Sequence, residues 1–133
     1  MEKRRLQDVG VLGRYEHPFA RVAEARDRLM YQRVESVSRG AGGQHLPCTA
    51  GELSAVIFED GTVRACEVLD DDIGNLNDVN WDLSRLWGST AAEGLRDKIK
   101  ETRCECTWEC AQADNVLFQP RLWPKLAAGA VKA

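Results

Sequence analysis

The stretch CTAGELSAVIFEDGTVRAC, residues 48–66, decides how the middle of the chain folds. Two runs of β-prone residues, at 55–58 and 62–66, flank an Asp-Gly pair. Asp-Gly is a strong signal for a tight hairpin turn, because such a turn needs positive φ angles that glycine adopts without strain. A hairpin returns the chain toward its starting point, so the sequence predicts that Cys48 and Cys66 lie close together.

The other three cysteines lie in one short segment, CECTWEC at 104–110. Such clustering argues against cysteines that serve only as small buried hydrophobic residues. A helix that begins at Cys106 would place Cys106 and Cys110 on one face, with Cys104 ahead of it. On this basis we expect Cys104 to be the thiol that a metal site can lose.

Five cysteines are an odd number, and the polar N-terminal sequence lacks the apolar region of an export signal, so a disulfide framework is not expected. Four soft thiolates suit either an iron–sulfur cluster or tetrahedral zinc, and spacing alone does not separate the two. His45 is expected to be a surface residue, with a mixed zinc site as the alternative.

The order of these features resembles the SPASM domain and the shorter twitch domain of radical SAM enzymes. The pattern consists of Cys48-x12-Gly61-x4-Cys66, the element Ile73-Gly74-Asn75-Leu76 and the dense cysteine group downstream, over residues 46–118. In that family such cysteines bind auxiliary [4Fe-4S] clusters. The resemblance implies this role for Cys48, Cys66, Cys104, Cys106 and Cys110.

The sequence also departs from the SPASM pattern. A full SPASM domain binds two clusters with a C-x2-C-x5-C-x3-C group, whereas this chain has five cysteines and a C-x-C-x3-C group. The resemblance therefore implies one [4Fe-4S] cluster, as in a twitch domain. The C-x3-C-x2-C motif of the family's catalytic half, whose cluster cleaves S-adenosylmethionine, does not occur here. We expect no catalytic residue in this chain.

The remaining sequence predicts an α+β fold: a small β-hairpin and short helices around a cysteine-ligated cluster, with an N-terminal helical arm. Apolar residues recur at helical intervals over 18–37, and glycines at 40–43 end that helix. The predicted organisation is an arm and linker at 1–43, an iron–sulfur domain at 44–120 and a flexible tail at 121–133. Short helices are expected near 81–87 and 91–102, the second capped by Ser89 or Thr90. Gly74-Asn75 is interpreted as a turn.

Composition excludes two classes of partner. A net charge of -3 and a pI near 5.4, with acidic and basic residues interspersed, give no basic surface for nucleic acid. No apolar run approaches the roughly 20 residues of a membrane span. We expect a cytoplasmic protein without membrane contact.

Three functions remain open, and one of them is enzymatic: an open iron site that binds substrate directly, as the resemblance allows for auxiliary clusters. Of the other two, the first is an accessory domain whose cluster relays electrons or anchors substrate for a radical SAM catalytic domain, in the same parent chain or as a separate subunit. Under this hypothesis the sequence is a fragment, a split-gene product or a stand-alone relic, and is not a complete enzyme. The alternative is an interaction domain stabilised by zinc on four cysteines, in which the metal supplies folding free energy.

Overall fold

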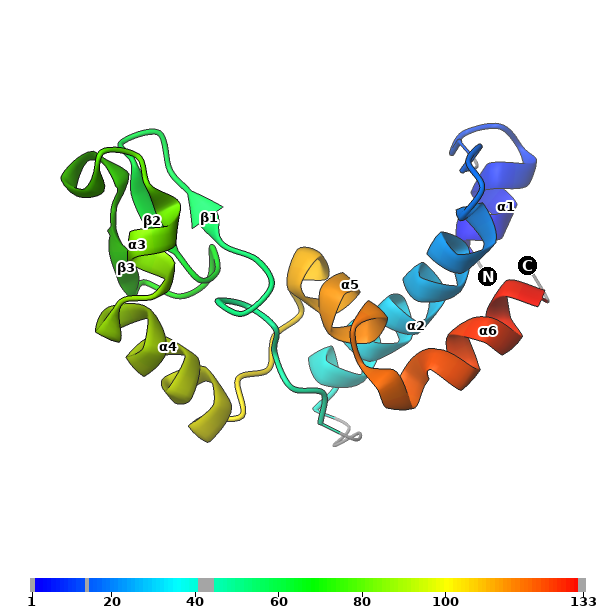
Figure 1. The fold of residues 1–133 in the computed structure, drawn as a ribbon. Helices are drawn as coiled ribbons and strands as arrows, with labels where there is room; N and C mark the ends of the chain where they lie inside the picture. Colours follow the sequence, from blue (N-terminus) through cyan, green and yellow to red (C-terminus); the bar gives the residue numbers. More distant parts are fainter. Residues whose placement is uncertain (1, 14, 41–44, 132–133) are drawn as a thin grey trace.

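The computed structural model describes residues 2–13, 15–40 and 45–131, which form two units (Figure 1). The sheet unit contains β1 (Val56–Ile57), β2 (Thr62–Arg64), β3 (Asp72–Asn75), the 3-10 helix η1 (Leu76–Val79), α3 (Leu83–Trp87) and α4 (Thr90–Glu101). The helical unit contains α2 (Ala20–Ser38), preceded by α1 (Glu2–Asp8), and α5 (Glu109–Leu117), the 3-10 helix η2 (Pro120–Leu122) and α6 (Trp123–Val131). Residues 45–55 and 102–108 connect the two units. The chain has an α+β fold, as predicted.

The predicted hairpin is confirmed. β1 and β2 pair antiparallel, with Ile57 opposite Val63, and Gly61 lies in the turn with φ +87°. The turn residue Asp60 accepts a hydrogen bond from the Thr62 backbone N–H through its carboxylate, which holds the reversal in place. Because the turn is fixed locally, the sequence signal was sufficient to predict it.

The interpretation of Gly74-Asn75 as a turn was wrong, because these residues belong to a third strand. β3 pairs antiparallel with β2, with Gly74 opposite Val63 and a bulge next to it. A Cβ on Gly74 would lie 2.8 Å from Cδ2 of Leu86, so the strand approaches α3 more closely than a side chain allows. Glycine at this position therefore allows β3 to pack closely against α3.

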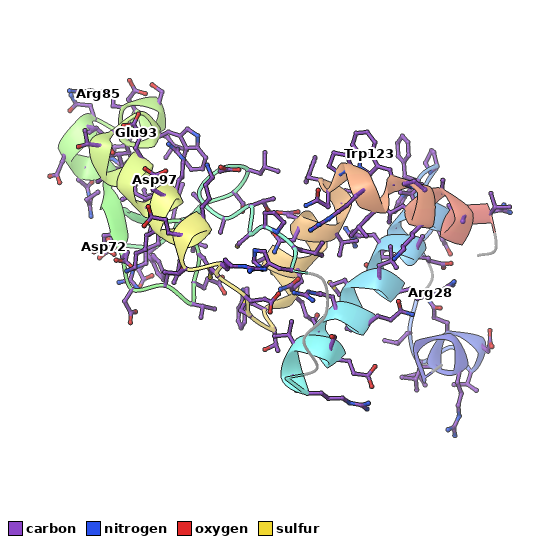
Figure 2. All side chains as sticks on the ribbon, turned by 90° about the horizontal axis from the view of Figure 1, so that it is seen from below. Arg28, Asp72, Arg85, Glu93, Asp97 and Trp123 are labelled. Carbon is purple, nitrogen blue, oxygen red and sulfur yellow. The ribbon has the colours of Figure 1, made fainter. Side chains whose placement is uncertain are left out.

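One hydrophobic core fills the sheet unit. The sheet, α3 and α4 bury ten residues together: Ala50, Val63, Ala65, Cys66, Ile73, Leu76, Leu86, Ala92, Leu95 and Ile99. Ser89 caps α4 as expected, since its hydroxyl accepts a hydrogen bond from the Ala92 backbone N–H. The charged residues Glu93 and Asp97 lie on the outer face of α4 (Figure 2).

A second core lies in the helical unit, where α2 packs against both α5 and α6. Its buried members are Ala25, Met30, Leu46, Val116 and Leu126. The predicted arm is therefore packed against residues of the predicted iron–sulfur domain. Helix α2 ends at Ser38, as the following glycines predicted, while the linker residues 41–44 lie outside the described residues.

The prediction of a flexible tail at 121–133 needs correction over residues 121–131. This segment is helical, and Leu126 of α6 is 6% exposed in the second core. Trp123 begins α6, and its indole N–H donates to the Leu117 carbonyl (Figure 2). The small residues of α6 have a packing partner only because α2, far away in the sequence, lies beside them. Within the described residues, no helix is long and apolar enough to cross a membrane.

Candidate metal centre

Four of the five cysteine thiols are near neighbours between the two units. Burial raises the pKa of the Cys104 thiol, and the nearby thiols of Cys48, Cys106 and Cys66 raise it further. Burial likewise raises the pKa of Cys106, with Cys48 and Cys66 adding to the effect. These mutual effects place the ends of the hairpin stretch and the later cysteine segment within electrostatic reach of each other.

Cys66 and Cys48 are held by the sheet unit. Cys66 follows β2 and is 9% exposed, and its Sγ accepts a hydrogen bond of 3.3 Å from the Val68 backbone N–H. Cys48 is half-buried and packs against the first core. A backbone N–H directed at sulfur is also a favourable contact when that sulfur binds a metal.

The end of α4 directs Cys104 toward the same place. After the helix ends at Glu101, Arg103 adopts a left-handed conformation with φ +50°, and the Cys104 N–H returns to the Ile99 carbonyl at 3.0 Å. A non-glycine residue in this region costs roughly 1 kcal/mol. The sharp reversal lets Cys104 pack against the first core instead of continuing outward.

The expected helix face shared by Cys106 and Cys110 was wrong. Helix α5 begins at Glu109, so Cys106 lies in the extended segment before it, where it faces the other thiols. Cys110 lies in the first turn of α5 and is exposed. The reason for treating Cys104 as the spare thiol therefore disappears.

Two buried amides on α5 contact the cysteine segments, and the sequence analysis missed both. Gln112 donates to the Cys106 carbonyl, and Asn115 accepts from Thr49, which follows Cys48. Their spacing of three places them on one helix face, beside the buried Ala111 and Val116. The sequence signal that could have identified these two amides is the presence of polar residues on a buried helix face.

Arginines surround the carboxylate between Cys104 and Cys106. That carboxylate, Glu105, forms an ion pair with Arg33 of α2 and lies 3.4 Å from Nδ1 of His45. Burial lowers the pKa of His45, and three nearby arginines lower it further: Arg103, Arg33 and Arg121. Three guanidinium groups near His45, one of them paired with Glu105, make this side of the candidate site positively charged.

The donor set fits a soft metal centre. Burial opposes the ionisation of Cys104 and Cys106, and the neighbouring thiols raise both pKa values further. A bound metal cation reverses this preference, because it stabilises thiolates that otherwise repel each other. In the described part of the chain, no group of three or more His, Cys, Asp or Glu side chains already has the spacing of metal ligands. The four thiols are therefore neighbours, and their positions are set by packing and by their own hydrogen bonds.

No family model matches this chain, and neither a curated protein nor a solved structure does.

Proposed function

We propose that the chain binds one [4Fe-4S] cluster as an accessory domain for a radical SAM catalytic domain. The observation that carries the proposal is that Cys48, Cys66 and Cys104 meet at the first core, with Cys106 within electrostatic reach of Cys48 and Cys66, while Cys110 is exposed on α5. The ligands in this proposal are Cys48, Cys66, Cys104 and Cys106. Cys110 is the spare cysteine, which replaces the earlier expectation for Cys104.

The position of these thiols suits a centre that also stabilises the fold. Cys48 and Cys104 pack on the core of the sheet unit, whereas the Cys106 backbone is hydrogen bonded to α5 of the helical unit. A metal held by all of them ties the two units together, so its binding free energy adds to folding free energy. The arginines around Glu105 also suit a negatively charged set of thiolates.

The choice of a cluster over zinc rests on the resemblance of the hairpin pattern to SPASM and twitch domains. A cluster supplies a one-electron redox centre, which a relay to or from a catalytic domain requires. This chain's residues would hold the centre, exclude water from it and set its charge environment.

One observation favours the alternative, an interaction domain stabilised by zinc on four cysteines. The Cys48 thiol contributes to the raised pKa of Cys104, and both residues pack against the first core, so the two sulfurs are close. Tetrahedral zinc with Zn–S bonds of about 2.3 Å places its sulfurs about 3.8 Å apart. Close sulfurs are compatible with that geometry.

Anaerobic reconstitution tests the proposal. With ferrous iron and sulfide the chain should turn brown and contain one [4Fe-4S] cluster, because a cluster absorbs visible light. Single alanine substitutions should abolish the colour at four positions: Cys48, Cys66, Cys104 and Cys106. The matched variant Cys110→Ala should keep it.

Two outcomes would contradict this assignment. Stoichiometric zinc without visible absorbance, after anaerobic purification and attempted reconstitution, would move the assignment to the zinc domain. Loss of the cluster in Cys110→Ala, together with retention in Cys104→Ala, would restore the ligand set expected from sequence spacing. With S-adenosylmethionine and a strong reductant, the loaded chain should form no 5'-deoxyadenosine.

A further inference from the structure

We infer that Gln112 and Asn115 of α5 are positioning residues that hold the two cysteine-bearing segments at the candidate metal centre. This inference rests on the proposed function, since it concerns the same four thiols. It adds that the helical unit sets the arrangement of these thiols, because one amide side chain of α5 holds each of the two cysteine-bearing segments.

Asn115 holds the segment that carries Cys48. Its Oδ1 accepts two hydrogen bonds from Thr49, one of 2.7 Å from the backbone N–H and one of 3.0 Å from the hydroxyl. Thr49 directly follows Cys48, so fixing its backbone restricts where the Cys48 thiol points. Asn115 is 3% exposed, which excludes water as a competing donor at this oxygen.

Gln112 holds the segment that carries Cys106. Its Nε2 donates to the Cys106 carbonyl at 2.7 Å. Fixing this carbonyl restricts where the Cys106 thiol points. Gln112 therefore holds one proposed ligand through its backbone.

Both amides are buried residues of α5, and Figure 1 shows this helix beside α2 near the segments that lead to the sheet unit. Gln112 is 2% exposed, and its Oε1 has no hydrogen bond donor among the described residues. Burying an amide without satisfying all of its groups costs free energy that an apolar residue would avoid. Retaining that amide for the sake of the fold alone is unfavourable, whereas a hydrogen bond that positions a metal-binding cysteine accounts for it.

The inference leads to different predictions for the two residues, because their amides form hydrogen bonds with different atoms of the cysteine-bearing segments. Asn115 contacts only backbone and hydroxyl groups of Thr49, so it positions a ligand without touching sulfur. Gln112 donates to the carbonyl of Cys106, so it positions a ligand residue directly. Removing either amide changes how a ligand is oriented and should therefore shift the reduction potential, with the larger shift for Gln112.

The test compares Gln112→Met and Asn115→Leu, which keep side-chain volume and remove the hydrogen bonds. Both variants should lose metal to a chelator more readily, with affinity about 10- to 100-fold weaker, as is usual when a group that orients a ligand is removed. Leu126→Ala is the matched control, because it weakens the second core from α6, a helix that carries neither a cysteine nor either amide. Voltammetry of the reconstituted proteins should show a shifted reduction potential for Gln112→Met and Asn115→Leu and an unchanged potential for Leu126→Ala.

Each outcome bears on a different claim. A wild-type chain that takes up neither iron nor zinc overturns the proposed function. A loaded wild-type chain whose Gln112→Met and Asn115→Leu variants match Leu126→Ala in both chelator resistance and potential overturns the positioning role alone. If Gln112→Met does not fold, Gln112→Glu replaces it, because a carboxylate keeps the shape and lacks the N–H donor.

Discussion

Replacing Gly74 by alanine tests the packing that holds β3 against α3. The new Cβ would lie 2.8 Å from Cδ2 of Leu86, whereas carbon atoms in contact are normally about 3.5–4.0 Å apart. Leu86 is 7% exposed, so its side chain cannot move away into solvent. Overpacking of this kind costs roughly 1–3 kcal/mol, and the positive φ of Gly74 adds about 1 kcal/mol. Gly74→Ala should therefore lower the free energy of unfolding by about 2–4 kcal/mol.

Gly94→Ala supplies the matched control within the same unit. Gly94 lies inside α4, and a Cβ there has no atom within 4 Å. Alanine is favoured over glycine in a helix by about 0.8–1.0 kcal/mol, so this variant should be more stable than wild type. Urea unfolding followed by circular dichroism measures both changes. Equal midpoints for Gly74→Ala and Gly94→Ala would refute the close contact between β3 and Leu86.

Three further predictions concern the helical unit and the thiols. Leu126→Ala should destabilise the chain by about 2–5 kcal/mol in a urea titration, and an unchanged midpoint would mean that α6 does not pack on α2. Arg33→Met should weaken metal binding in a chelator competition, because it removes a positive charge beside Glu105, whereas exposed Arg85→Met should not. The metal-free chain should lose stability as pH rises above about 8.5, since the raised pKa of Cys104 favours the folded state only while the thiol is protonated. Urea midpoints across that range should fall in wild type and fall less in Cys104→Ala.

The local features of the fold were predictable from sequence. The hairpin follows from one Asp-Gly pair, and α4 follows from the Ser89 cap and an apolar repeat that buries Leu95 and Ile99. Each of these signals lies within a few residues of the structure that it specifies. No distant contact is needed to interpret them.

The features that were missed depend on contacts between distant segments. β3 contains a glycine because Leu86 approaches it, and α6 is stable because α2 covers Leu126. The start of α5 at Glu109 also escaped prediction, because Trp108 at the N-cap forms no side-chain cap hydrogen bond. Without a capping signal, the cysteine spacing alone suggested an earlier start.

The sequence identified the cysteines that could bind a metal, but it did not identify which four of them lie together. Clustering identified all five cysteines as candidates. The separation of four neighbouring thiols from Cys110 depends on where α5 begins and on the reversal at Arg103. The amides of Gln112 and Asn115 became visible only once that helix was placed beside both segments.

Counting protected thiols in the metal-loaded chain tests the central claim most directly. The protein, purified and reconstituted without oxygen, is treated with an alkylating reagent, and the modified cysteines are identified by mass spectrometry after digestion. We predict modification of Cys110 alone while metal is bound, and modification of all five cysteines after the metal is removed under denaturing conditions. Protection of Cys110, or modification of any of the other four thiols in the loaded protein, would contradict the assignment.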